Sequence, residues 1–477
     1  MSALAARPER SPAVRTVLDG LGGAEAWLVG GTVRDALRDD PSLDEPDLVV
    51  TGDAERVARA LADRADAFVF PLSERFGAWR VIARDRTWQS DVTPVRGTIE
   101  ADLTLRDFTI NAMAVPATDP GRLIDPHGGE TDLRDRTIRA VTGRSFADDP
   151  LRALRMVRFA CDLNFRIEPG TSALAAAEAT RLEGVAPERS FYELRRLVAG
   201  PDPRHGIELM DSTGLVAVLL PELEALKGVE QNPYHHRDVW GHTLEVLERV
   251  VEVTDDPAGA LGESGPGIGR ELAQPLGDEL TRGEALRFGA LLHDAGKPAT
   301  RVVTDEGRVL FWGHDRVGAD LARAFGRRLH TSGALSEFVA ALAQHHLHLG
   351  FLVHERPLSR RHVYRYLRKC EPVEVEVTVL SVADRLATLG PRTRDEAVEG
   401  HVALARELAG EALAWRTGNR PHAPIRGDDL MAELGLEPGP AVGRLLDAID
   451  EAAFAEEVRT REEALALARR EAKSALA

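Results

Sequence analysis

The stretch that decides the fold of this chain is Leu28-Val29-Gly30-Gly31-Thr32-Val33-Arg34-Asp35. It predicts a short apolar strand, a glycine turn and an arginine just beyond the turn. A second strand follows, with Glu45 and Asp47 at positions i and i+2, so both carboxylates are expected on one face. Paired carboxylates beside such a turn suit divalent cations that carry a nucleoside triphosphate. A plain glycine turn followed by two solvated acids explains these residues equally well.

Length and composition limit the class of protein. The chain has 477 residues, more than one hydrophobic core usually supports, so three or four domains are expected. No apolar run approaches the roughly 18 residues that span a bilayer, and the first eight residues lack a signal-peptide pattern. We therefore expect no membrane partner. The only two cysteines, Cys161 and Cys370, exclude a disulfide framework and fit a reducing cytoplasm.

The charge is acidic overall but patterned. A formal net charge of −17 argues against broad nucleic-acid binding, which depends on cation–phosphate contacts. Arg152, Arg155 and Arg158 nevertheless recur at helical spacing, which places them near one face. A second basic group comprises Arg189, Arg195, Arg196 and Arg204. Both faces could bind RNA, and a solvated helix surface explains each of them at least as well.

The secondary-structure pattern changes along the chain. Strands are predicted at 26–29, 48–51, 67–71, 79–82 and 87–92, with a helix over 54–65. From about residue 148 the pattern is helical almost throughout. The glycine- and proline-rich stretch 255–278 predicts a flexible surface insertion. The fold class is therefore α+β, with a mixed α/β domain at the N-terminus followed by helical domains.

Three further segments extend the first motif. Asp91 ends the strand at 87–92 and could supply a third carboxylate. Residues 102–114 contain Arg106-Asp107-Phe108-Thr109-Ile110-Asn111-Ala112, and residues 146–159 contain Asp148-Asp149-Pro150-Leu151-Arg152. Together with the glycine turn, and in the same order, these segments resemble the motifs of the class II polynucleotide nucleotidyltransferases. That family comprises bacterial CCA-adding tRNA nucleotidyltransferases and related poly(A) polymerases, and the resemblance runs along nearly the whole chain.

The resemblance implies a set of site residues. Two Mg²⁺ ions would be held by Glu45 and Asp47, with Asp91 as a third catalytic acid. The nucleotide would be bound by a larger set: Gly30, Gly31, Arg34, Arg106, Asp107, Asn111, Asp149, Arg152 and Arg155. Within this set Asp149 and Arg152 would act as a protein template that matches the edge of C or A. RNA contacts would come from Arg158, Arg189, Arg195 and Arg196.

A second constellation lies in the helical part of the chain. It comprises His242, the pair His293-Asp294, His314, the pair His345-His346, and Asp384. This order resembles the HD superfamily of metal-dependent phosphohydrolases, which implies phosphatase or cyclic phosphodiesterase activity. His293 and Asp294 would lie about 100° apart on a helix, so both could reach one ion. Imidazole and carboxylate ligands suit Mn, Ni, Co, Fe or Zn, and Mg²⁺ is a further candidate. His235, His236 and His348 are expected to be structural or surface groups.

The sequence departs from the family pattern at three positions. Glu45 stands where the family usually has Asp, and Leu105 stands where it has an arginine. Pro46, between the two strand acids, cannot donate to a strand ladder and so predicts an edge strand. These departures motivate two alternatives: an HD phosphohydrolase with a degenerate head, and a non-catalytic RNA-binding protein.

The leading hypothesis is a template-independent nucleotidyltransferase that adds C, A or both to the 3′ end of tRNA, using CTP, ATP and Mg²⁺. A poly(A) polymerase differs from it only in acceptor and nucleotide preference. The expected domains are a head at 1–140, a nucleotide-selecting and RNA-binding neck at 141–225, an HD domain at 226–390 and a C-terminal helical body at 391–477.

Overall fold

The structure, a computed structural model, describes residues 11–38, 43–73, 77–418, 420 and 422–474. The first eight residues, where we expect no signal peptide, lie outside this set. The chain divides into two compact units, 1–219 and 220–477. No helix in the described part combines the length and apolarity needed to cross a membrane.

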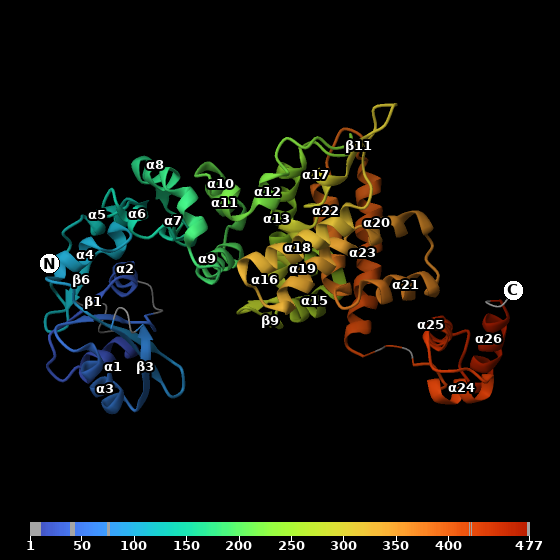
Figure 1. The fold of residues 1–477 in the computed structure, drawn as a ribbon, viewed down its shortest axis with the longest axis horizontal. Helices are drawn as coiled ribbons and strands as arrows, with labels where there is room; N and C mark the ends of the chain where they lie inside the picture. The colour runs from blue at the N-terminus through green and yellow to red at the C-terminus, as the bar shows by residue number, and fades with distance from the viewer. Residues whose placement is uncertain (1–10, 39–42, 74–76, 419, 421, 475–477) are drawn as a thin grey trace. The chain divides into compact units, whose positions relative to one another are not determined.

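A six-stranded mixed sheet forms the centre of the head (Figure 1). Its spatial order is β3-β4-β5-β2-β1-β6, and only the β2–β5 pair is parallel. The strands are β1 (Ala26–Val29), β2 (Asp47–Val50), β3 (Ala67–Ser73), β4 (Ala78–Ala83), β5 (Gln89–Pro94) and β6 (Ala114–Pro116). The expected strands and the helix over 54–65 are confirmed, the latter as α3 (Ala54–Ala65), which Asp53 caps. Helix α3 packs against β3, β4 and β5, with α1 (Pro12–Gly20) beside it.

The junction between β1 and α2 (Gly31–Leu37) is the expected glycine turn. Gly30 has φ +65°, a conformation that glycine adopts without steric cost. The Thr32 hydroxyl then accepts from the Asp47 amide at 2.9 Å and donates to the Glu45 carbonyl at 3.4 Å. One side chain thereby holds the start of α2 against the start of β2.

Two expectations at β2 are wrong. Glu45 precedes the strand, which begins at Asp47, so the pair does not share a strand face through simple alternation. The strand itself is internal, between β5 and β1. Pro46 is tolerated because it lies outside the ladder, where no strand hydrogen bond requires its missing N–H.

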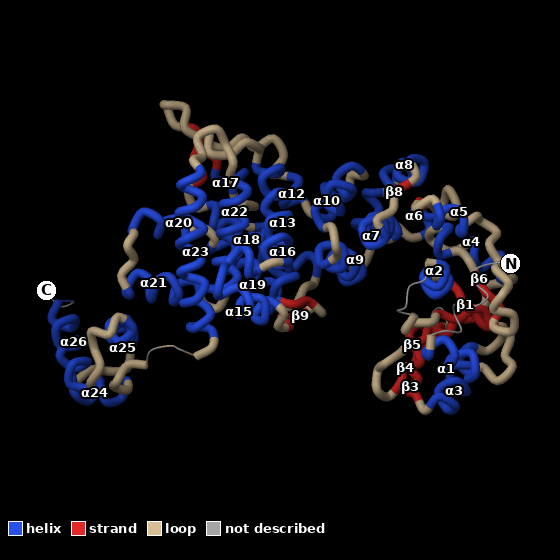
Figure 2. The backbone as a smooth tube through the Cα atoms, turned by 180° about the vertical axis from the view of Figure 1, so that it is seen from behind, coloured by secondary structure: helices blue, strands red, loops and turns tan. Residues whose placement is uncertain are grey.

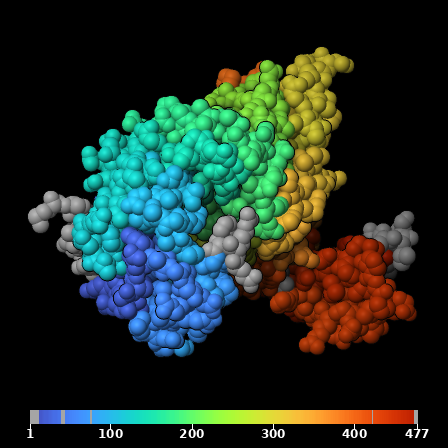
Figure 3. Space-filling view, turned by 60° about the vertical axis from the view of Figure 1, so that its left-hand side comes forward, coloured from blue at the N-terminus to red at the C-terminus, as the bar shows by residue number. Residues whose placement is uncertain are grey.

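Short helices complete the first unit. In the head they are α4 (Ile99–Thr104) and α5 (Gly129–Arg134); in the neck they are α6 (Ser145–Asp148), α7 (Arg152–Leu163), α8 (Pro169–Ala177), α9 (Pro187–Ala199), α10 (Pro203–Ser212) and α11 (Leu215–Leu219). Phe108 of the head contacts Phe146 and Phe159 of the neck, with ring centroids 6.5 and 6.0 Å apart. Figure 3 accordingly shows the cyan atoms of the head running without a break into the green neck helices.

The second unit is a helical bundle (Figure 2). Its main helices are α13 (Val239–Asp255), α16 (Arg282–Leu292), α18 (His314–Leu329), α19 (Gly333–His345), α22 (Glu374–Ala387) and α23 (Asp395–Arg416). Around them lie α12 (Pro221–Glu224), α14 (Pro257–Leu261), α15 (Gly265–Leu272), α17 (Lys297–Thr300), α20 (His348–Leu352), α21 (Arg360–Cys370) and the hairpin of β11 (Arg301–Val303) and β12 (Val309–Phe311). Helices α24 (Gly427–Leu434), α25 (Pro440–Phe454) and α26 (Arg461–Ser474) close a separate small core around Leu430 and Ile449.

The prediction of a flexible insertion at 255–278 is wrong. The stretch forms α14 and α15, and Gly265, Gly267 and Ile268 are buried. A Cβ added at Gly267 would lie 2.2 Å from Leu413 Cδ2 of α23. The glycines therefore permit close helix packing. A high glycine and proline content alone does not distinguish such packing from a flexible loop.

Replacing Gly267 by leucine should consequently destabilise the second unit by about 1–3 kcal/mol, the usual cost of overpacking. Gly269 is the matched control on the same helix, because an added Cβ there meets only Pro257 at 3.5 Å. Gly269→Ala should be neutral or stabilising through helix propensity. Thermal denaturation of both variants measures the difference, and equal melting temperatures would contradict the packing role.

Candidate functional site

The turn at Gly30 is bounded by one carboxylate and one guanidinium. A Cβ added at this residue would lie 2.9 Å from Arg106 Nη1 and 3.6 Å from Asp47 Oδ2. Backbone and charged groups therefore meet here with no room for a side chain, as expected where a phosphate chain approaches a glycine turn.

Three carboxylates gather beside this turn. Burial raises the pKa of Asp47 to about 7, helped by the charges of Asp91 and Glu45 and opposed by those of Arg106 and Arg80. Asp91 accepts two hydrogen bonds from Arg80, at 2.7 and 2.8 Å. A carboxylate whose pKa is raised in this way is suited to a site where a bound cation balances its charge. Mg²⁺ prefers ligand sets made of oxygen atoms, as here.

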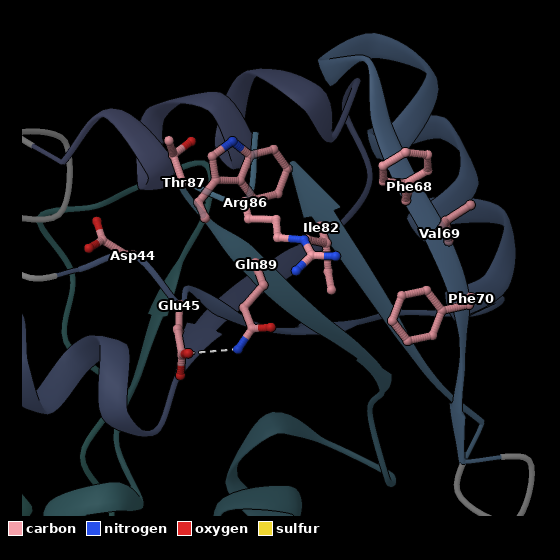
Figure 4. A pocket seen from close by; sticks show the side chains of 10 residues that line it. Asp44, Glu45, Phe68, Val69, Phe70, Ile82, Arg86, Thr87 and Gln89 are labelled. Atoms are coloured by element: carbon pink, nitrogen blue, oxygen red, sulfur yellow. Dashed lines mark hydrogen bonds between the residues drawn. The ribbon is translucent and has the colours of Figure 1, made fainter. Parts of the chain in front are cut away.

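Glu45 lies at the edge of this cluster. Its side chain is exposed, and its Oε1 accepts from Gln89 Nε2 at 2.6 Å (Figure 4). The longer side chain therefore reaches the cluster from the loop before β2, and not from the strand.

Arg106 has a hydrogen-bonding group without a protein partner. Its Nε is buried and makes no hydrogen bond to any described residue. Burial lowers the pKa of the guanidinium, although Asp102 and Asp47 favour its charge; the nearest Asp102 oxygen is 3.8 Å away. An unsatisfied buried cation at a glycine turn is suited to an anionic ligand.

Four predicted nucleotide ligands form a continuous hydrogen-bonded chain. Arg34 donates to Asn111 at 2.8 Å, Asn111 donates to Asp107 at 3.1 Å, and Asp107 accepts from Arg155 at 2.7 and 3.0 Å. Arg34 also forms a two-point pair with Asp35. The Arg155 pair holds the pKa of Asp107 near 2 against the effect of burial. The structure thus brings these residues together, and they satisfy one another.

The expected template pair lies at the start of the neck. Arg152 donates to three backbone carbonyls, the shortest to Leu105 at 2.6 Å. Asp149 precedes α7 and accepts from Arg189 of α9 at 2.9 Å. Leu105, which stands where the family has an arginine, therefore contributes its carbonyl group to fix the orientation of Arg152.

The four predicted RNA-binding arginines divide into two pairs. Arg189 and Arg196 are exposed on α9, whereas Arg158 and Arg195 are 3% and 9% exposed. Arg158 is committed to ion pairs inside the neck, with Glu193 at 2.6 Å and Asp162 at 2.8 Å, so its burial contradicts a direct RNA contact. Helical periodicity placed it on the arginine face but could not show that this face is packed.

Tyr192 was missed by the sequence reasoning. It is 45% exposed on α9, with Arg195 and Arg196 near its ring at 5.0 and 5.6 Å. In the sequence, the tyrosine is followed three and four residues later by two arginines, and this spacing could have indicated a surface for RNA.

Glu193 is the residue on which this neck network depends. It is 2% exposed and accepts from both Arg155 and Arg158. Glu193→Ala would remove one of the two carboxylates that each of these arginines pairs with, leaving only Asp107 and Asp162, so we expect a loss of about 1–3 kcal/mol in unfolding free energy. Denaturant titration measures it, and the exposed Glu183→Ala should change stability by less than about 0.5 kcal/mol. Equal effects would show that the buried pairs contribute nothing.

The second candidate site gathers around Asp294. Its ligand atoms fall into two groups, His242-His293-Asp294 and Asp294-His314-His346, each within 4.8 Å. Asp384 completes the first group, with its Oδ1 3.0 Å from His242 Nε2. The two Asp294 oxygens and His293 Nε2 are buried and make no well-aligned hydrogen bond among the described residues, although Lys297 Nζ forms an ion pair with Asp294 Oδ2 at 2.7 Å. Several buried carboxylate oxygens and imidazole nitrogens that lack hydrogen bonds and lie this close together indicate a set of metal ligands.

Local structure explains how these ligands converge. His293 directly follows α16, whose N-terminus carries a Thr281–Glu284 capping box. His242 lies in the first turn of α13, which Asp238 caps. His293, His314 and His346 each direct Nδ1 to a backbone carbonyl at 2.7 Å, those of Ala290, Phe311 and Ala343. This arrangement turns each Nε2 toward the centre, which is the usual way that proteins orient metal-binding imidazoles.

The electrostatics match this reading. Burial lowers the pKa of His346 to about 3 and that of His235 to about 3, so both imidazoles are neutral and able to ligate. The pKa of Asp294 lies well below its usual range, because the charges of His293 and Lys297 outweigh burial. Metal ligands must be deprotonated, and these three groups are. Against the effect of burial, Asp294 raises the pKa of His293, whose proton a bound cation would displace.

Three sequence expectations change here. His345 is not in the site: its ring lies beside His348, with centroids 5.2 Å apart, because adjacent helical residues face different directions. His235, expected to be structural, lies 4.8 Å from the His242 ring and lines the cavity. Lys297, which was not considered, pairs with Asp294 at 2.7 Å; its position three residues after the aspartate was the available signal.

An open cavity of about 670 Å³ gives access to this cluster. Its wall carries Lys297, Arg385, Arg392 and Arg394. Positive groups around a metal cluster suit a phosphorylated substrate.

Family models match three consecutive parts of the chain. "Poly A polymerase head domain" covers 26–139, "Probable RNA and SrmB- binding site of polymerase A" covers 164–227, and "HD domain" covers 239–389. The domain limits expected from the sequence stay a prediction beside these ranges.

Similar proteins cover nearly the whole chain. The A-adding tRNA nucleotidyltransferase of Deinococcus radiodurans is 36% identical, over 93% of this chain and 95% of its own. The CC-adding tRNA nucleotidyltransferase of Thermus thermophilus is 34% identical, over 93% and 92%. The fold is similar to that of the Thermotoga maritima CCA-adding enzyme complexed with tRNA, with TM-score 0.61, 23% identity and 96% and 94% coverage. At 34–36% identity over nearly the full length of these two relatives, the chain belongs to the tRNA nucleotidyltransferase family.

Proposed function

We propose that this protein adds C, A or both to the 3′ end of tRNA without a nucleic-acid template. The observation that carries this proposal is the Asp47 carboxylate at the Gly30 turn, whose pKa burial raises to about 7 with help from the charges of Asp91 and Glu45. Relatives named for A addition and for CC addition are about equally similar to this chain, so the product is open between A, CC and CCA.

The head residues divide the chemistry among them. Asp47, Glu45 and Asp91 would hold Mg²⁺, which when bound activates the attacking hydroxyl and neutralises the triphosphate. Arg106, with its unpaired Nε, and the Gly30-Gly31 turn would bind the phosphates. Arg34 would join them by exchanging its bond to Asp35 for one to phosphate.

The neck would select and guide the substrates. Asp149 and Arg152 present an acceptor oxygen and guanidinium donors for a base edge, with Arg155 one turn further on. Arg189 and Arg196 are exposed on α9 and would contact RNA phosphates, which position an RNA by shape more than by sequence. The two buried free cysteines support a cytoplasmic location.

A second activity, metal-dependent phosphohydrolysis, is favoured by the Asp294 cluster. Its two ligand groups share one carboxylate, an arrangement that suits two metal ions or one ion with alternative ligands. The bound ion would be Mn, Ni, Co, Fe, Zn or Mg²⁺, and a metal-bound water would act on a phosphoester. This site lies in the second unit and shares no residue with the head site.

Incubation of the protein with Mg²⁺, labelled CTP or ATP, and tRNA trimmed by one, two or three 3′ nucleotides tests the first proposal. Incorporation of a defined C, A or CCA end supports it. A long adenylate tail would favour a poly(A) polymerase. Binding of tRNA without incorporation from any acceptor would overturn it in favour of a degenerate head.

A further inference from the structure

Asp91 shares one face of the head sheet with an exposed aromatic surface. Cross-strand pairing places Arg80 opposite Asp91, Phe70 opposite Arg80, and Phe68 opposite Ile82. Paired residues in neighbouring strands point to the same face. Helix α3 packs on the sheet at β3, β4 and β5, yet Phe68 and Phe70 remain 53% and 40% exposed. These rings therefore lie on the face that α3 does not cover.

A cavity of about 850 Å³ lies between this aromatic surface and Glu45, the outermost of the three acids. Glu45 and Gln89 line one side, joined by their hydrogen bond, and Phe68, Phe70 and Ile82 line the other (Figure 4). Its volume is within the range of roughly 300–1,000 Å³ for sites that hold small organic groups. One side of the cavity therefore carries Glu45, and the other side offers aromatic and aliphatic side chains to a flat apolar group.

The position of the cavity relative to the acids indicates which substrate would occupy it. The phosphate-binding groups, Gly30 and Arg106, lie next to Asp47, whereas the cavity begins at Glu45 and extends over β3 and β4. The attacking hydroxyl must approach the α-phosphorus opposite the departing pyrophosphate, so the acceptor strand has to enter from the side away from the phosphates. Aromatic faces stack on nucleobases of any sequence, and Arg86 in the wall adds a positive charge for the strand's phosphates.

We propose that Phe68 and Phe70 form a stacking platform for the last bases of the RNA acceptor, which positions its 3′ hydroxyl at the acids. The proposal rests on the nucleotidyl transfer proposed above. It assigns Phe68 and Phe70 a positioning role, in which the rings contact the acceptor strand and not the incoming nucleotide.

The test compares Phe68→Ala/Phe70→Ala with the wild-type enzyme. Loss of stacking should raise the KM for trimmed tRNA roughly ten- to a hundredfold, while the KM for CTP or ATP stays unchanged. Phe68→Tyr/Phe70→Tyr keeps both rings and should restore the wild-type KM. Leu72→Ala is the matched control, because Leu72 is 44% exposed on the same strand and does not line the cavity.

A second measurement reports stacking without turnover. Trimmed tRNA ending in 2-aminopurine should lose fluorescence on binding the wild-type protein and not on binding the alanine double variant. If the wild-type protein incorporates no nucleotide, the proposed function fails, and this quenching alone decides the platform. Unchanged RNA KM and quenching in the double variant, or an equal rise in both KM values, overturns the platform. A wild-type dimer that the double variant converts to monomer, with RNA KM unchanged, identifies the face as a self-interface and also overturns it.

Discussion

Asp47→Ala should lower nucleotide incorporation by roughly a thousandfold or more, since the bound metal supplies several kcal/mol of transition-state stabilisation and each 1.4 kcal/mol is tenfold. Asp47→Asn should behave in the same way, because an amide keeps the shape but loses the charge. Single-turnover incorporation into trimmed tRNA measures the effect. His293→Ala, in the second unit, is the control and should leave the rate unchanged. Residual activity within tenfold of wild type would contradict the role of Asp47.

The same residue should make metal binding and stability depend on pH. Its pKa is raised from 3.8 to about 7, so its contribution to metal-free stability is complete below about pH 4 and is lost as pH rises through 7. The metal-free protein should therefore melt at a lower temperature at pH 8 than at pH 5, relative to Asp47→Asn. Mg²⁺ should reverse the loss above pH 7, because it binds the ionised carboxylate. Parallel pH profiles for the wild-type protein and the variant would contradict this expectation.

Asp294→Asn should abolish the proposed phosphohydrolase activity and reduce metal content to background. It removes the one carboxylate that both ligand groups share, while keeping its volume. Metal analysis of the purified protein and phosphate release from monoester and cyclic diester substrates measure both effects. Incorporation into trimmed tRNA should be unaffected.

His345 provides the matched comparison for this site. It is adjacent to His346 in sequence but lies beside His348, outside both ligand groups. His345→Ala should retain metal and phosphohydrolase activity, whereas His346→Ala should lose both. A similar loss in the two variants would show that the ligand set is wrong.

The sequence predicted the parts of the fold in which local pattern and chemistry agree. Strand β1 and the Gly30 turn follow from four apolar residues and a glycine pair, whereas helix α2 was not predicted. His293-Asp294 was recognised because a buried apolar helix rarely ends in two ligating groups. The carboxylate Asp47 was placed beside the turn because two acids follow the glycine pair at strand spacing.

The errors came from contacts distant in sequence. The position of Glu45 is fixed by Thr32 and Gln89, neither of which a strand pattern includes. Arg158 is buried because Glu193 lies against it from another helix. His235 reaches the metal cluster through the path of an irregular loop, and periodicity carries no information about such a path.

The hydrogen-bonded chain from Arg34 through Asn111, Asp107 and Arg155 to Glu193 has a consequence for inheritance. It crosses from head to neck, and the ion pair between Asp107 of the head and Arg155 of the neck joins the two parts. A chimera with the head of one relative and the neck of another would leave an unpaired charge between the two parts unless both relatives carried this aspartate and this arginine. The two parts are therefore expected to pass between lineages as a single piece.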